Sequence, residues 1–200
     1  MNQVFDRGFK SWCEKVSEGF RKDLGLKVTD PLDAWLLAKE LGIVVWTPEA
    51  IPGLDSATLK QLTRTDPSSW SAATICWDSQ ELIILNSQHS KARQSSDLMH
   101  EMSHLIIGHP PARADIDETG FLMLSSYDKK QEEEANWLAG TLLLPRAALL
   151  HILISRMDEE TAASRYNASR DMLQWRKNVT GAALQAKRGG HYVLGKTRGR

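Results

Sequence analysis

The sequence lacks the features that mark membrane-spanning and exported proteins. No stretch without a charged side chain exceeds eleven residues, and Pro67–Trp77 is one of that length, whereas a transmembrane helix needs about twenty apolar residues. The N-terminus has no apolar core of the length that a signal peptide requires. We therefore expect a cytoplasmic protein with no membrane partner.

Cysteine is scarce as well. The two cysteines, Cys13 and Cys76, lie far apart and form no Cys-x-x-Cys pair. Without an export signal we expect both to be reduced, buried thiols.

The formal net charge is zero, because 25 basic residues balance 25 acidic ones. This balance argues against a general nucleic-acid coat and against an acidic-tail protein. The charges are nevertheless unevenly placed: from Arg165 onward nine basic residues accompany one acid, Asp171, so this region carries +8 and the rest −8. We expect residues 182–200 to form a basic, flexible tail. Direct binding of nucleic acid is not expected, although this tail leaves it open.

The composition is that of a globular protein, with 42% hydrophobic and 25% charged residues. We expect one domain, at residues 1–181. The order of elements predicts an α+β fold with a small antiparallel three-stranded sheet and surrounding helices. A helix over 6–24 is followed by a second that opens at Pro31, with Asp30 as its N-cap. The strands are expected at Ile43–Trp46, Ala73–Trp77 and Glu81–Asn86. Further helices are expected at about 91–107, 130–144, 146–156, 159–166 and 169–178, the last three belonging to a C-terminal helical part over 146–181.

The most informative segment is His100-Glu101-x-x-His104, on the helix expected at 91–107. Residues four apart lie on one face of a helix, so both imidazoles can bind one metal ion. Glu101 is offset by one position, beside the metal. There it can take a proton from an activated water and later pass it to a leaving amine. The pattern predicts a zinc site with Glu101 as the catalytic base.

A catalytic zinc usually has three protein ligands, so a third is expected from another element. The segment 131–137 offers it, because Glu132 and Asn136 share one face of the helix predicted there. We expect Glu132 to be the third ligand and Asn136 to hydrogen-bond a ligating histidine.

The same segment leaves alternatives open. Glu133 and Glu134 point elsewhere on the helix, and the whole acidic run would also suit the first turn of a helix, whose dipole favours negative charge. The small residues Ala139 and Gly140 continue the face of Glu132, and we expect them to let this helix pack closely against the helix of the histidine motif.

Other candidate side chains have weaker signals. His109 would lie about 140° around the helix from His104, so it should not bind the same metal, and we interpret it as a helix-end contact. His151 lies in an apolar run and is expected in the core. Tyr127 falls between the two metal-binding helices and is a candidate oxyanion donor, although a plain packing role is the preferred interpretation.

The His100-Glu101-x-x-His104 motif, followed by Glu132-x-x-Ala-Asn136 in a helix that runs to Leu-Leu-Leu-Pro145, resembles the ImmA/IrrE family of zinc metallo-endopeptidases. The similarity extends from about residue 7 to residue 181, without the N-terminal helix-turn-helix of some relatives. It implies a zincin-like metallopeptidase domain in which His100, His104 and Glu132 are the zinc ligands and Glu101 is catalytic.

The resemblance also implies a function: site-specific cleavage of a protein, with a helix-turn-helix transcriptional repressor of a mobile element or stress response as the expected substrate. We expect the strand at Glu81–Asn86 to be an edge strand that pairs with an extended substrate. The alternative is a non-catalytic regulatory module that keeps the zinc fold and binds a transcription factor or DNA, as in a toxin–antitoxin pair.

Overall fold

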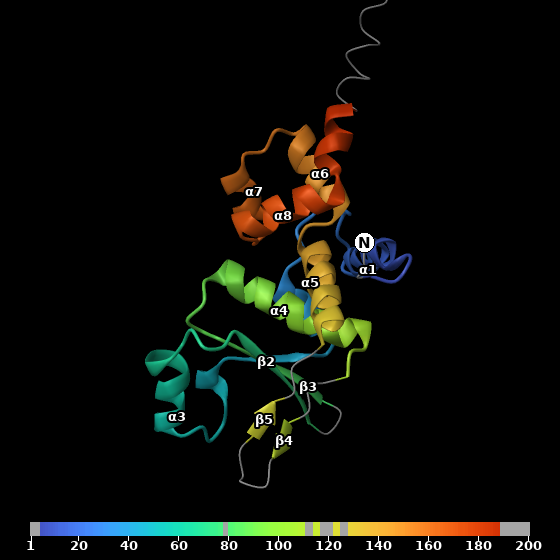
Figure 1. Cartoon of the computed structure of the whole chain (residues 1–200). Helices are drawn as coiled ribbons and strands as arrows, with labels where there is room; N and C mark the ends of the chain where they lie inside the picture. Colours follow the sequence, from blue (N-terminus) through green and yellow to red (C-terminus); the bar gives the residue numbers. More distant parts are fainter. Residues whose placement is uncertain (1–4, 78–79, 111–113, 117–121, 125–127, 189–200) are drawn as a thin grey trace, which may run out of the picture.

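The computed structural model describes residues 5–77, 80–110, 114–116, 122–124 and 128–188. It has the predicted α+β architecture (Figure 1). The helices are α1 (Phe9–Asp23), α2 (Ala34–Glu40), α3 (Ser56–Lys60), α4 (Lys91–Ile107), α5 (Lys129–Leu143), α6 (Arg146–Ile154), α7 (Glu159–Arg165) and α8 (Arg170–Thr180), with short helical turns at Pro48–Ala50 and Gln61–Thr65. The strands are β1 (Val44–Trp46), β2 (Ala72–Trp77), β3 (Gln80–Leu85), β4 (Ala114–Ile116) and β5 (Leu122–Leu124).

The main sheet is mixed, which corrects the expected antiparallel sheet. Its order is β1-β3-β2, with β2 and β3 antiparallel but β1 and β3 parallel. Neighbouring strands such as β2 and β3 pair antiparallel readily, whereas β1 reaches β3 only after the long connection through α3 and β2, which permits a parallel pairing. Because β3 is central and hydrogen-bonded on both sides, the expectation that it is an edge strand is wrong. Within the part of the chain that the structure describes, β2 and β1 form the edges.

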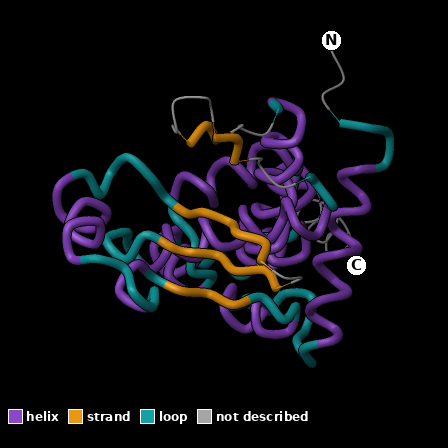
Figure 2. The backbone as a smooth tube through the Cα atoms, turned by 90° about the horizontal axis from the view of Figure 1, so that it is seen from below, coloured by secondary structure: helices purple, strands orange, loops and turns teal. Residues whose placement is uncertain are grey.

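Helices cover one face of this sheet. Figure 2 shows the three strands side by side with the helices behind them. Ile83 and Leu85 of β3 are buried under this layer, and their alternation along the strand follows the two-residue period of side chains in a sheet. The other face carries Trp46, Ile75 and Leu82, which line a pocket of about 690 Å³.

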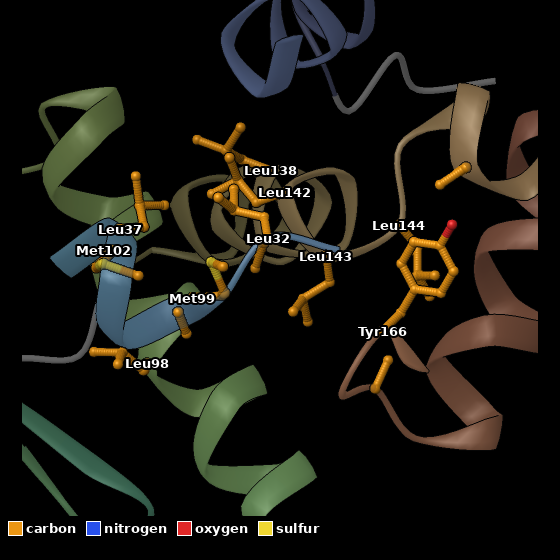
Figure 3. Close-up of a cluster of buried hydrophobic side chains, with 14 of the residues drawn as sticks. Leu32, Leu37, Leu98, Met99, Met102, Leu138, Leu142, Leu143, Leu144 and Tyr166 are labelled. Atoms are coloured by element: carbon orange, nitrogen blue, oxygen red, sulfur yellow. The ribbon is translucent and has the colours of Figure 1, made fainter. Parts of the chain in front are cut away.

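The core lies where α4 and α5 cross (Figure 3). Met99 and Met102 of α4 and Leu138 and Leu142 of α5 are completely buried, together with Leu37 of α2. Helix α1 is held against α5 by buried polar groups as well, since the Arg21 guanidinium donates to the carbonyl of Leu142 at 2.8 Å. Burial of these apolar side chains fixes the two long helices relative to each other.

The C-terminal helices α6, α7 and α8 gather at the end of the molecule away from β2 and β3 (Figure 1). Buried Tyr166 ties them to the N-terminal part, because its hydroxyl donates to the carbonyl of Thr29 at 2.6 Å. The segment expected as a tail begins with helical residues 182–188, where Ala182 is buried and Gln185 accepts a hydrogen bond from Arg146. Residues 189–200 lie outside the described residues.

Two local expectations need correction. Helix α2 begins at Ala34 with Asp33 as its N-cap, which accepts from the amide of Leu36, and not with Asp30. Gly140 does not face α4: a Cβ there would lie 2.6 Å from Trp175, so this glycine lets α5 approach α8. The helical pattern correctly predicted small side chains at a close crossing but not which helix crosses there.

Among the described residues, no single helix is long and apolar enough to cross a membrane. Helices α5 and α6 are long and apolar enough only when they are taken together, and they meet at a bend of 46°.

Candidate metal centre

Helix α4 places His100 and His104 on one face, as their spacing predicts. It begins at an N-cap, Ser90, whose hydroxyl accepts from the amide of Arg93, and it ends at Gly108, which adopts the left-handed conformation with φ 82°. The buried side chains of this helix anchor it in the core. His104 is only 1% exposed, whereas His100 is partly exposed.

Helix α5 brings the carboxylate of Glu132 to the same point. Its N-terminus is fixed by a capping box, in which the Asp128 side chain accepts from the Gln131 amide and the Gln131 side chain accepts from the Asp128 amide. Glu132 lies in the first turn that follows this cap. The crossing of α4 and α5 therefore decides where its carboxylate lies.

The three side chains present their donor atoms as a small triangle. The Nε2 atoms of His100 and His104 are 3.2 Å apart, and Glu132 oxygens lie 3.4 Å from the first and 3.5 Å from the second. A tetrahedral zinc ion with bonds of about 2.0–2.1 Å separates its ligand atoms by roughly 3.3–3.4 Å. The donor atoms thus already have the spacing of three corners of such a site, and together they could hold a metal ion.

Both histidines contact further polar groups through the nitrogen that faces away from this triangle. The Nδ1 of His100 lies 3.2 Å from Oδ1 of Asn136, which places Asn136 where the helical spacing predicted it. The Nδ1 of His104 lies 2.9 Å from Nδ1 of His109. Such partners orient a ligating imidazole and set which nitrogen carries the proton.

Burial keeps His104 uncharged. Removal from water, with the nearby His100 and His109, lowers the pKa of His104 to about 3. A neutral imidazole retains the lone pair that a metal needs. His104 therefore stays ready to bind a metal throughout the neutral pH range.

Glu101 lies beside the triangle and is held by a residue that the sequence analysis missed. The Thr74 hydroxyl of β2 donates to Oε2 of Glu101 at 2.5 Å. Burial raises the pKa of Glu101 above its usual value, while the Thr74 hydrogen bond and His100 act in the opposite direction. Nothing in the pattern of β2 distinguishes Thr74 from an ordinary strand residue, so only the packing of β2 under α4 shows this contact.

His109 and Glu134 are the other residues whose position the sequence did not show. His109 does not join the donor triangle, as expected, but it contacts His104 directly instead of only ending the helix. Its Nε2 lies 3.2 Å from Oε2 of Glu134, and this carboxylate is buried, with a side chain that is 11% exposed. Glu133 stays partly exposed and forms a long ion pair with Lys129.

The remaining candidates lie elsewhere. Tyr127 falls outside the described residues. His151 is exposed on α6, which corrects its expected place in the core, because the buried stripe of α6 consists of Ala148, Leu149 and Ile152. Cys13 is a free, buried thiol, whereas the side chain of Cys76 is outside the described ones.

A helix with paired histidines packed on a small sheet, and a second helix that supplies a carboxylate, define a zincin-like metallopeptidase domain. A family model described as the IrrE N-terminal-like domain, Peptidase_M78, matches residues 38–177, and the chain belongs to this family. A solved structure titled "Mycobacterium tuberculosis transcriptional regulator" is similar with 13% identity and a TM-score of 0.46 over 84% of this chain. The chain covers 46% of that regulator. A search of curated proteins finds no match.

Proposed function

We propose that this protein is a zinc-dependent endopeptidase. The observation that carries the proposal is the triangle of His100, His104 and Glu132 donor atoms, with the carboxylate of Glu101 held beside it by Thr74. Two imidazoles and one carboxylate form a donor set typical of catalytic zinc, with a fourth position left for water or substrate.

Each residue has a defined task in this proposal. A bound zinc ion would supply a Lewis acid that polarises the scissile carbonyl and activates a water molecule. Glu101 accepts a proton from that water at a carboxylate oxygen and then donates it to the nitrogen of the leaving amine. Thr74 holds the carboxylate of Glu101 in place, and Asn136 orients the ring of His100.

The edge of β2 suits an extended substrate. Among the described residues β2 pairs only with β3, so its other side offers backbone donors and acceptors. Thr74, on this same strand, contacts Glu101. A peptide that adds to β2 by main-chain hydrogen bonds would therefore run along the centre. We therefore propose for β2 the substrate-pairing role that was expected of the strand at Glu81–Asn86.

We propose a protein as the substrate, and specifically a helix-turn-helix repressor. The support is the family resemblance, which links such sites to regulated cleavage of transcription factors. An extended, exposed segment of a repressor would fit the edge of β2.

The test joins metal content with turnover. We expect about one zinc per wild-type chain by elemental mass spectrometry, much less in Glu132→Ala, and unchanged zinc in the neighbouring control Glu133→Ala. We expect the zinc-loaded wild type to produce new N-termini in a proteome-derived peptide library, read by mass spectrometry.

Glu101→Gln separates the reaction from metal binding. This variant should keep its zinc and lose at least a hundredfold in cleavage, the range that removal of a general base produces. Turnover at the wild-type rate by Glu101→Gln would contradict the mechanism. A zinc-loaded wild type that cleaves nothing would favour the non-catalytic module.

A further inference from the structure

A chain of polar contacts runs from His104 through the buried side chains of His109 and Glu134, on the side away from the donor triangle. Gly108 ends α4 in the left-handed conformation, and the amides of both Gly108 and His109 donate to the carbonyl of His104, at 3.1 and 3.0 Å. This turn folds the chain back toward His104. The side chain of His109 therefore lies against His104, a position that a continued helix would not give it.

The contacts allow only one arrangement of protons when His104 offers its Nε2 to a metal. A neutral imidazole that binds through Nε2 carries its proton on Nδ1. His104 then donates from Nδ1 to Nδ1 of His109, 2.9 Å away. His109 must carry its own proton on Nε2, which donates to Oε2 of Glu134 at 3.2 Å. In this arrangement each N–H group along the chain of contacts meets an acceptor.

Glu134 is itself fixed by its surroundings. Its side chain is 11% exposed, and its second oxygen lies 3.7 Å from Nζ of Lys130, which also contacts Asp6 at 3.1 Å. The side chain of His109 is only 6% exposed. A buried carboxylate that is paired with a cation on one side is a strong and well-placed acceptor on the other.

We propose that His109 and Glu134 are positioning residues that hold His104 in the tautomer and ring orientation in which Nε2 faces the metal. This inference rests on the proposed metal centre. It adds a second function to α5, which supplies a ligand through Glu132 and an anchor for the opposite side of the centre through Glu134. In this proposal the pair acts on the metal through its contact with His104.

Zinc affinity tests the proposal without any substrate. We would measure the zinc dissociation constant by competition with a chromogenic chelator for wild type, His109→Phe and Glu134→Gln. Loss of such supporting contacts weakens metal binding by about 10- to 100-fold, so we expect that loss for His109→Phe and roughly tenfold for Glu134→Gln. The matched controls are His151→Phe, at an exposed histidine, and Glu133→Gln, one residue before Glu134. Both should bind zinc within twofold of wild type.

Two further measurements separate positioning from folding. Urea unfolding in EDTA reports whether a variant is folded without metal, so that affinity is compared between folded proteins. Nitrogen-15 NMR of the histidine side chains in the zinc-loaded protein should show the His104 proton on Nδ1, and Glu134→Gln should disturb the His109 signals. His109→Gln, whose side-chain oxygen can accept from His104, should recover part of the affinity lost in His109→Phe.

The outcomes distinguish this inference from the proposed function. Wild-type affinity in a folded His109→Phe would overturn the positioning role and leave the metal centre intact. A wild type that binds no zinc would overturn both.

Discussion

At the scale of single residues, burial decides the chemical character of side chains near the crossing of α1 and α5. Cys13 is completely buried, and burial raises the pKa of its thiol to about 12. Since the thiolate is the reactive form, a cysteine in this environment is chemically inert. Arg21 of α1 is also completely buried. The cost of burying its guanidinium is offset by the hydrogen bonds that it donates to the carbonyls of Asp30 and Leu142.

Cys13 should therefore resist alkylation in the native protein. With iodoacetamide at pH 8 we expect its modification to be at least a hundredfold slower than in urea, because both the thiolate population and access are reduced. Peptide mapping by mass spectrometry follows Cys13 separately from Cys76. Equal rates in the native and unfolded protein would show that the α1–α5 interface opens readily.

At the scale of elements, the close approach of α5 and α8 depends on Gly140. A Cβ at this position would lie 2.6 Å from the ring of Trp175 and 3.0 Å from Cδ of Arg176, whose guanidinium is also buried. A glycine inside a helix normally costs about 0.5–1 kcal/mol relative to alanine. Its presence in α5 is explained by this contact.

Gly140→Ala should thus lower the free energy of unfolding despite its better helix propensity. Forcing an extra carbon into a packed interface costs about 1–3 kcal/mol, so we expect a net loss of roughly 1–2 kcal/mol in urea unfolding. Gly19 is the matched control: it lies inside α1, and a Cβ added there would have nothing within 4 Å. Gly19→Ala should stabilise the protein by about 0.4–1 kcal/mol. A stabilising Gly140→Ala would show that α8 moves aside at no cost.

At the scale of the whole molecule, the candidate centre joins parts of the chain that are far apart in sequence. Its candidate ligands come from α4 and α5, Thr74 comes from the sheet, and α5 in turn contacts α1 and α8. A metal that binds only the folded arrangement therefore stabilises the entire domain.

Removal of metal should accordingly lower the melting temperature. Free zinc at 100 times its dissociation constant adds about 2.7 kcal/mol to the stability, which for a chain of this size corresponds to roughly 5–10 °C. Calorimetry of the zinc-loaded protein with and without EDTA measures this difference. Glu132→Ala should show little change on addition of EDTA; an equal shift in that variant would place the stabilising metal elsewhere.

The sequence alone determined the features that depend on neighbours along the chain. Helix α4 was predicted with its observed bounds. The other predicted helices and strands begin and end within about three residues of the bounds that the structure shows. The shared faces of His100 and His104, and of Glu132 and Asn136, follow from the helical period alone. Helix α3 was missed, since it is only five residues long and buries none of them.

Only the tertiary structure decided which elements meet. The parallel pairing of β1 with β3, the contact of Gly140 with α8 and the hydrogen bond from Thr74 to Glu101 join residues that no local pattern relates. The turn at Gly108 carried His109 off the helical period and onto His104. A helical or strand period specifies the face on which a side chain lies, whereas its partner across the interface is selected by the packing of the whole core.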